Sequence, residues 1–376
     1  MSKPRILAFY LPQYHPIPEN DEWWGKGFTD WQNVAKAKPR FFGHYQPHIP
    51  TDLGFYDLRQ EESRIAHAEM AREYGISGFC YYHYWFNGKM LLEKPFNEVL
   101  NSGKPDFPFC LCWANENWTR RWDGMDNEIL MGQNYDDYDP EMHILWFEKA
   151  FSDKRYIRID EKPLLLIYNT IDIPDLKNKI VTWRYTARKK GFKDLYLCSV
   201  KSVHYNLSDP EVLSLGFDAI VDFIPNNEIF KFRKISGLPR HYFYRIINKI
   251  ISVFQLENIF EKLPITDILS YKKIVNDKIK QLNSNYRYFP CVIPSWDNSA
   301  RKKYAHVIQN EDLEIYKRWL ENSFEKVKYY SSDEQIVFIN AWNEWAEGCH
   351  LEPDVRNGRK FLEATLETLK RVSHFS

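Results

Sequence analysis

The sequence lacks several features that define large classes of proteins, such as membrane-spanning and nucleic-acid-binding proteins. No apolar run approaches the roughly 20 residues that a membrane-spanning helix needs. Basic and acidic residues are equal at 51 each, so no net charge favours nucleic acid as a partner. The six cysteines form no CxxC pair, and most lie in apolar runs, where a thiol acts as a small hydrophobic group. The N-terminus does not resemble a secretory signal. We therefore expect reduced, structural cysteines and a cytoplasmic protein.

A glycine-rich phosphate loop is also absent after the first apolar run, which makes a doubly wound open sheet the second choice of fold. Short apolar runs instead alternate with amphipathic stretches along the whole chain. Near-continuous apolar runs are typical of parallel strands covered on both faces. The eight predicted strands are 6–12, 78–84, 107–113, 163–169, 195–200, 219–225, 289–295 and 335–342. Helical patterns lie between most of them, for example 57–75, which ends on Gly75, and 312–330. We predict an α/β fold, a (β/α)8 barrel of the TIM type, as a single domain over residues 1–376.

Residues 226–286, between the sixth and seventh predicted strands, exceed what a minimal barrel needs, so we expect a helical insertion there. Within the insertion, apolar residues from Phe243 to Phe254 recur at helical spacing with basic residues beside them. The expected helix packs on the barrel. The alternative is a helix at 243–254 that contacts a lipid surface or a partner.

Polar and aromatic residues gather at the carboxyl ends of the predicted strands, where such a barrel builds its active site. Aromatic residues make up 16% of the chain, and the polar atoms of Trp and Tyr need partners when buried. Amide and carboxylate groups bind hydroxyls, and indole rings stack on sugar faces, so we predict an oligosaccharide or polysaccharide substrate. The expected substrate-binding residues, in one pocket, are Tyr10, Gln13, His15, His48, Tyr82, His83, Tyr84, Trp85, Trp113, Asn115, Glu116, Trp296, Asp297 and Asn343.

The stretch "NAWNEWAEGCHLEPD" (340–354) follows the eighth predicted strand and carries Glu344 and Glu347 between indole side chains. In an extended strand these two carboxyl groups would point to opposite sides. If the chain turns helical after Trp342, they share a face about 5–6 Å apart. That separation suits a retaining glycosidase pair, and mutual burial would let one carboxyl keep a proton near neutrality. The alternative is an exposed first turn of a helix, favoured by the helix dipole.

A metal site was considered for His15, His48 and His83, but no cluster with ligand spacing is visible in the sequence. We therefore expect no metal ion and no cofactor.

Three further residues keep two interpretations. Glu116 either belongs to the site or forms an ion pair with Arg120 or Arg121. Trp23 and Trp24 either belong to the core or contribute to the site.

Three long motifs carry a resemblance to a known family. They are "FYLPQYHPIPENDEWWGKGFTDWQNVAKAKPRFFGHYQPHIPTDLGFYDLR", "WANENWTRRWDG" and "NAWNEWAEGCHLEPD". They resemble the WbsX-like family of bacterial surface-polysaccharide loci, which belongs with the glycoside hydrolase family 99-like domains. The resemblance runs from Ile6 to about Arg371, but residues 226–286 carry no matching motif. It implies a (β/α)8 barrel that needs no metal.

The resemblance also implies a mechanism. In the hydrolase family two glutamates of a NEWxEG stretch are catalytic, and they match Glu344 and Glu347. The first deprotonates the sugar's own 2-hydroxyl, which attacks C1 and forms a 1,2-anhydro sugar. The second protonates the leaving oxygen and later activates water. We expect a retaining, endo-acting glycoside hydrolase or transglycosidase on α-linked glycan of the mannose type, in surface-polysaccharide metabolism.

Two other functions stay open. The WbsX-like group is commonly labelled glycosyltransferase, so the first alternative is a glycosyltransferase of O-antigen, lipopolysaccharide or capsule biosynthesis. The second is a glycan-binding barrel without catalysis. Turnover that depends on a sugar nucleotide would favour the first alternative, and tight binding without any turnover would favour the second.

Overall fold

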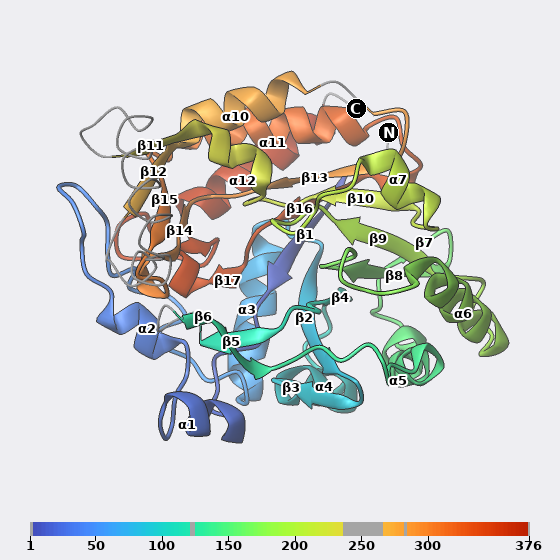
Figure 1. The fold of residues 1–376 in the computed structure, drawn as a ribbon. Helices are drawn as coiled ribbons and strands as arrows, with labels where there is room; N and C mark the ends of the chain where they lie inside the picture. Colours follow the sequence, from blue (N-terminus) through green and yellow to red (C-terminus); the bar gives the residue numbers. More distant parts are fainter. Residues whose placement is uncertain (1–2, 121–124, 236–265, 282–283, 375–376) are drawn as a thin grey trace, which may run out of the picture.

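A closed barrel of eight parallel strands forms the centre of the computed structural model, which describes residues 3–120, 125–235, 266–281 and 284–374 (Figure 1). Each strand pairs with the next along the chain, and the last returns to the first, where Ile6 lies opposite Val337. The barrel strands are β1 (Arg5–Tyr10), β2 (Gly78–Phe86), β4 (Phe109–Trp113), β8 (Lys162–Ile167), β9 (Tyr196–Val200), β10 (Ala219–Asp222), β13 (Tyr288–Val292) and β16 (Ile336–Ile339). Each overlaps one predicted strand, which confirms the predicted (β/α)8 fold.

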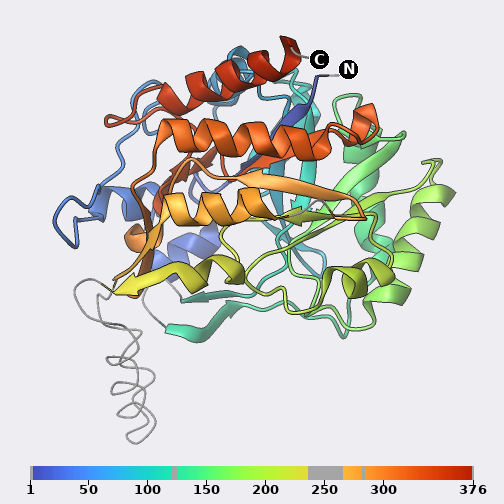
Figure 2. The same cartoon turned by 90° about the horizontal axis from the view of Figure 1, so that it is seen from above.

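Helices surround the barrel and cover the outward faces of its strands. They are α3 (Glu61–Glu73), α4 (Lys94–Ser102), α5 (Pro140–Ser152), α6 (Leu176–Lys189), α7 (Asp209–Ser214), α10 (Tyr271–Lys280), α11 (Leu313–Val327) and α12 (Lys360–His374), with α1 (Pro18–Trp24) and α2 (Trp31–Lys36) in the first loop. The last three, α10, α11 and α12, lie side by side over one flank (Figures 1 and 2). No helix within the described ranges is long and apolar enough to cross a membrane.

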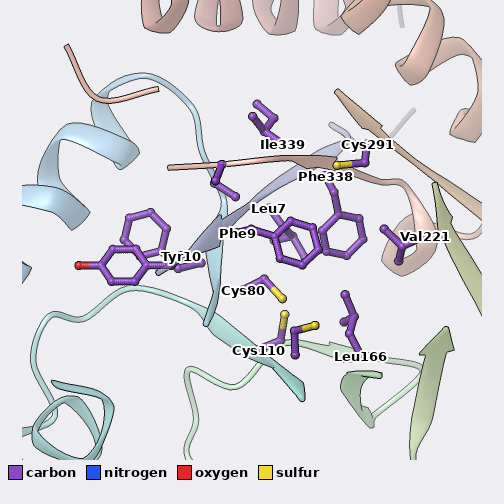
Figure 3. Packing of buried hydrophobic residues seen from close by; sticks show 14 of the residues in the cluster. Leu7, Phe9, Tyr10, Cys80, Cys110, Leu166, Val221, Cys291, Phe338 and Ile339 are labelled. Atoms are coloured by element: carbon purple, nitrogen blue, oxygen red, sulfur yellow. The ribbon is translucent and has the colours of Figure 1, made fainter. Parts of the chain in front are cut away.

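The barrel interior is apolar, and at the carboxyl ends of the strands it forms the floor of a cleft. Figure 3 shows Phe9 at its centre, with the thiols of Cys80 and Cys110 close by. The Phe9 ring lies 5.6 Å from that of Tyr82 and 5.2 Å from that of Phe223, centroid to centroid, and both of these partners line the cleft. All six cysteines are free and buried, in agreement with their apolar sequence context.

Smaller elements are added to the barrel, several of them at the carboxyl ends of its strands. A second sheet has the order β11 (Arg233–Ile235), β12 (Thr266–Ser270), β15 (Ala305–Gln309) and β14 (Trp296–Asp297). The antiparallel pairs are β5 (Trp118–Arg120) with β6 (Met125–Met131) and β17 (Asn343–Glu344) with β18 (Cys349–His350), while β3 (Lys89–Leu91) pairs with β2 and β7 (Arg158–Ile159) with β8. The 3-10 helices are η2 (Asn227–Phe232), η3 (Asn298–Ala300), η4 (Ser332–Glu334) and η5 (Trp345–Glu347).

The insertion expected at 226–286 holds more than helix. Its described residues form η2, strands β11 and β12, and helix α10. The two strands belong to the second sheet, so the insertion contributes to the layer beside the cleft. The apolar stretch 243–254 lies outside the described residues, and its helix and its contact with a lipid surface or partner stay predictions.

The predicted C-terminal glycine of α3 supplies a stability test. Gly75 has a φ of 81°, and an added Cβ would lie 2.8 Å from Cδ2 of Leu369, a fully buried side chain of α12. Gly191, after α6, has a φ of 91° with nothing within 4 Å of the added Cβ. Gly191→Ala should therefore cost only left-handed strain of about 1–2 kcal/mol, whereas Gly75→Ala should cost about 1–3 kcal/mol more from overpacking.

Urea unfolding of the two variants measures this difference in the free energy of unfolding. If both variants lose the same free energy of unfolding, the close packing of Gly75 against α12 does not limit the size of the side chain at residue 75.

Candidate active site

A cleft of about 340 Å³ opens at the carboxyl end of the barrel. Each of the eight barrel strands, or the loop directly after it, contributes to the lining. These residues are Leu11, Tyr84, Ala114, Tyr168, Val203, Phe223, Trp296 and Asn340. The cleft is therefore the place where the loops of all eight strand–helix units converge, as the barrel fold predicts.

Aromatic rings form much of the wall. Trp24 of α1, Trp118 of β5 and Trp296 of β14 line the cleft together with Tyr84. Trp118 packs edge-on to Tyr84 at 5.2 Å, and Trp23 packs against Trp118 from outside the lining at 5.9 Å. Of the two tryptophans with two interpretations, Trp24 belongs to the cleft and Trp23 supports it. The wall thus combines flat apolar faces with phenol and indole hydrogen-bond donors.

The two glutamates lie on a tight hairpin directly after β16. Strand β17, which contains Glu344, pairs with β18, and the turn between them is the 3-10 helix η5, which ends on Glu347. In a 3-10 helix residues three apart lie on the same side, so the predicted helical turn brings Glu344 and Glu347 to one face. Gly348 closes the turn at a φ of 52°, where an added Cβ would lie 3.0 Å from Cβ of Asp297.

Asn343 fixes this hairpin to the end of β1. Its Oδ1 accepts a hydrogen bond from the Leu11 backbone at 2.7 Å, and its Nδ2 donates to the Leu11 carbonyl at 3.0 Å. The Tyr14 hydroxyl donates to the Asn343 carbonyl at 2.8 Å and accepts from the Trp345 N–H at 3.1 Å. The first and last strands of the barrel therefore share one hydrogen-bonded unit that sets the position of Glu344.

Arg301 bridges the two glutamates. Its Nη1 lies 2.9 Å from Oε1 of Glu347 and 3.1 Å from Oε2 of Glu344. The rest of the guanidinium pairs with Asp30, which is fully buried. One buried cation thus faces three carboxyl groups, so like-charge repulsion disfavours ionisation of all three at once.

The two glutamates differ in their surroundings. Burial raises the pKa of Glu344 to about 8; the charge of Arg301 opposes this rise, and those of Glu347 and Asp30 add to it. Glu347 is more open, with 31% of its side chain exposed against 9% for Glu344. Its second oxygen accepts a hydrogen bond from Nε1 of Trp296 at 3.1 Å. The alternative of an exposed helical turn does not describe this pair, in which Glu344 is buried and Glu347 is partly buried.

The predicted substrate-binding residues divide into two groups. The cleft is lined by Gln13, Tyr82, Tyr84, Glu116 and Trp296. The remaining ones lie outside its lining, namely Tyr10, His15, His48, His83, Trp85, Trp113, Asn115, Asp297 and Asn343. We carry only the first group forward as candidate substrate contacts. Glu116 pairs with His204, whereas the side chains of Arg120 and Arg121 lie outside the described residues.

Most residues of the second group are buried and form side-chain hydrogen bonds within the protein, whereas the side-chain nitrogens of His15 and Trp85 are buried without a partner among the described residues. The Tyr10 hydroxyl bonds the His67 ring at 2.9 Å, and the His83 ring bonds that of His143 in α5 at 3.1 Å. Nε1 of Trp113 donates to a backbone carbonyl at 3.2 Å. For the four that lie on barrel strands, Tyr10, His83, Trp85 and Trp113, the physical reason is the alternation of side chains along a strand, which sends every second residue toward the helices and away from the cleft.

Sequence reasoning missed Arg301 and Asp30. The available signal was charge: two carboxyl groups buried together need a cation near them. It also missed Lys302 and His306, which join the lining because the segment from η3 to β15 lies beside the cleft.

Comparison with protein families and with curated proteins gives one family match and two curated relatives. A family model described as "Glycosyltransferase WbsX" matches residues 6–365. An uncharacterized protein WxcX from Xanthomonas campestris pv. campestris (strain ATCC 33913) is 38% identical over 369 residues, which are 98% of this chain and 50% of that protein. A WxcX protein from strain B100 matches equally well. The chain therefore spans about half the length of the curated relatives it matches.

Solved structures share the barrel. The GH99 endo-alpha-mannosidase from Bacteroides thetaiotaomicron superposes with a TM-score of 0.55 at 13% identity, covering 99% of both chains. A glycoside hydrolase-like protein gives a TM-score of 0.55 at 14% identity, covering 98% of this chain and 94% of the other. At these identities the likeness establishes a common fold.

The raised pKa of Glu344 predicts how stability depends on pH. Between about pH 4.5 and 8 the folded state keeps a proton that the unfolded state has lost, so stability falls as pH rises through this window. In Glu344→Gln the side chain at this position cannot ionise. The free energy of unfolding should therefore decline less between pH 4.5 and 8 than in the wild type, by on the order of 2–4 kcal/mol. Burial also raises the pKa of Glu352 to about 8, so a fall of the same sign should persist in the variant.

Urea unfolding of wild type and variant at pH 5 and pH 8.5 measures this effect, with Glu314→Gln, whose side chain is 79% exposed, as the control. If the stability of Glu344→Gln declines as steeply as that of the wild type, Glu344 does not hold the proton.

Proposed function

The chain belongs to the Glycosyltransferase WbsX family, and from that premise we propose that its barrel is a retaining carbohydrate-active enzyme. The proposed reaction is endo-cleavage or transglycosylation of an α-linked glycan, of the mannose type, in bacterial surface-polysaccharide metabolism. One observation carries the proposal: Glu344 and Glu347 meet at one guanidinium on the wall of an aromatic cleft. The GH99 barrel fold supports a glycan as the substrate.

The chemical character of the lining supports a sugar ligand. Trp24, Trp118 and Trp296 offer indole faces for stacking on pyranose rings, and Gln13 and Asn298 offer amides for hydroxyl groups. The cleft is an open groove of about 340 Å³ at the barrel surface. A groove of this kind can hold a few sugar units of a longer chain, which suits endo-acting cleavage.

The spacing of the glutamates supports a retaining outcome. Oε2 of Glu344 and Oε1 of Glu347 lie within 3.1 Å of the same nitrogen, so they cannot be farther apart than twice that distance. Retaining pairs are about 5–5.5 Å apart, and inverting pairs about 6.5–9.5 Å apart to leave room for a water molecule.

In the proposed mechanism Glu344 is the base and Glu347 the acid/base. Glu344 takes the proton of the sugar's 2-hydroxyl, whose oxygen bonds to C1 while the bond from C1 to the leaving oxygen breaks. Glu347 gives its proton to that oxygen, then deprotonates a water that opens the 1,2-anhydro sugar at C1, and Glu344 returns its proton to the 2-oxygen. A carboxyl with a raised pKa is a stronger base once ionised, and the more exposed Glu347 can reach both leaving group and water.

The charge pattern of the site places a constraint on these roles. Burial raises the pKa of Glu344, so the proposed base holds a proton near neutral pH, and Glu347 accepts hydrogen bonds from Arg301 and Trp296. The proposed roles therefore require the substrate to redistribute the proton between the two glutamates. The opposite division, with Glu344 as the acid, is the competing mechanism on the same site.

A glycosyltransferase of O-antigen or capsule assembly is the second candidate, because the family model carries that description. A cytoplasmic location, which stays a prediction, would fit biosynthesis. Turnover of defined α-linked oligosaccharides without any sugar nucleotide favours the first proposal, and strict dependence on a sugar nucleotide favours the second.

The division of labour predicts different responses of the two glutamine variants. Glu347→Gln should lose about 10²–10⁴-fold more kcat/KM on a natural linkage than on an aryl α-glycoside, because a phenol of low pKa leaves without protonation. Glu344→Gln should depress both substrates alike, because the 2-hydroxyl needs a base whatever group leaves. The measurement is kcat/KM of each variant on both substrates.

Exposed Glu314→Gln is the control and should match the wild type on both substrates. If Glu344→Gln, and not Glu347→Gln, loses much less kcat/KM on the aryl glycoside than on the natural linkage, then Glu344 is the acid and Glu347 the base. A 2-deoxy-2-fluoro glycoside should not react with the wild type, and its covalent attachment to Glu344 would make that residue an ordinary nucleophile.

A further inference from the structure

Three buried side chains that do not line the cleft meet beside the catalytic hairpin. Nδ1 of His48 lies 2.9 Å from Nε2 of His350, and Oδ2 of Asp354 lies 4.0 Å and 3.8 Å from these two nitrogens. Each residue is at most 6% exposed. In the part of the chain that the structure describes, this is the one place where ligand atoms of at least three His, Cys, Asp or Glu side chains all lie within 4.8 Å of one another.

We propose that His48, His350 and Asp354 form a binding site for one divalent transition metal ion, with zinc as the best match. The point equidistant from the corners of a triangle with these three sides lies about 2.1 Å from each, and zinc takes imidazole nitrogen at about 2.0–2.1 Å and carboxylate oxygen at about 2.0–2.2 Å. Two imidazoles and a carboxylate are a donor set that zinc favours over magnesium or calcium.

A hydrogen bond beside the cluster orients the His350 ring so that it can bind an ion. Nδ1 of His350 lies 2.9 Å from the Glu352 carbonyl oxygen and donates to it, so Nε2 presents its lone pair toward His48 and Asp354. A second-sphere carbonyl of this kind is typical of metal-bound histidines.

A hydrogen-bonded histidine pair is the ordinary alternative, with Asp354 held by Asn357, whose backbone N–H donates to Oδ1 and whose Nδ2 donates to Oδ2 at 3.5 Å. In that arrangement Nδ1 of His48 donates to Nε2 of His350 and no ion is needed. The Asp354 oxygen, at 3.8–4.0 Å, is too far from either ring to accept a hydrogen bond. The pair of His83 and His143, whose Nε2 atoms lie 3.1 Å apart, shows a similar contact between ring nitrogens, and no third His, Cys, Asp or Glu ligand of the described chain joins it.

The surrounding charges favour a cation. Asp297 acts on His48 electrostatically, and Glu311 interacts with Asp354 and Asp297, so acidic groups surround the cluster. The nearby positive charge is Arg356, and it is partly neutralised by Glu311 at 3.3 Å.

An ion at this place would join two distant segments of the chain. His48 belongs to the loop between α2 and α3, and His350 belongs to β18 of the hairpin that carries Glu344 and Glu347. The Trp345 ring of η5 stacks on the His350 ring with centroids 3.8 Å apart. The ion would thus fix the hairpin to the loop that contains His48. An effect of the ion on the catalytic glutamates rests on the proposed function, whereas the binding site itself does not.

The test is metal binding by the full chain. After treatment with a chelator, the protein is titrated with Zn²⁺ or Co²⁺, passed through a desalting column and measured for metal content and Tm. We expect one ion per chain, visible absorption from bound Co²⁺ and a Tm raised by a few degrees with the ion well above its Kd. His350→Gln and Asp354→Asn should lose the ion, whereas His143→Gln should keep it.

A wild-type protein that retains no metal and shows the same Tm with Zn²⁺ as with Mg²⁺ would overturn the proposal and leave an ordinary histidine pair. Retention by Asp354→Asn and His350→Gln alike would place the ion elsewhere and overturn it as well. Loss of glycan cleavage with the metal still bound would count against the proposed function and not against this site.

Discussion

One buried guanidinium organises the candidate active site. Arg301 reaches Asp30 in the first loop of the chain and Glu344 and Glu347 in the last, so it joins three segments that are far apart in sequence. Removing the cation of such a buried group costs about 3–5 kcal/mol, because the carboxyl groups left behind have no counter-charge. Burial raises the pKa of Glu344, and because one cation does not balance three carboxyl groups, the charges of Glu347 and Asp30 add to the rise. The burial that makes the site costly to fold also gives it a group able to exchange a proton near neutral pH.

The barrel provides the rigid frame for this arrangement. Its core reaches the cleft through Phe9, which supports Tyr82 and Phe223 from below. The hairpin with the glutamates is attached to β1 through Asn343 and to the loop before α3 through the contact of His350 with His48, and the stacking of Trp345 on His350 stiffens it internally. Second-sphere contacts of this kind keep two carboxyl groups at a fixed separation, which general acid–base chemistry requires.

Local patterns in the sequence were sufficient for the strands and for the glutamate hairpin. Apolar runs predicted the eight strands, and the three-residue spacing of Glu344 and Glu347 predicted the turn that brings the two carboxyl groups together. The direction of individual side chains was not predictable. In β2, Tyr82 and Tyr84 face the cleft while His83 packs on α5, and this depends on strand register and tilt, which no local pattern encodes. Arg301 and the contact between His48 and His350 depend on segments that meet only after folding.

The most direct test of the account is the anomeric configuration of the first product. The protein is incubated with a defined α-linked oligosaccharide in the absence of sugar nucleotides, and the released reducing end is followed by proton NMR before mutarotation. Two glutamates acting through a 1,2-anhydro sugar predict that the α-anomer appears first, with the β-anomer growing only at the rate of mutarotation. A β-anomer as the first product would contradict the retaining pair, and release that occurs only with a sugar nucleotide would contradict glycan cleavage as the activity of this barrel.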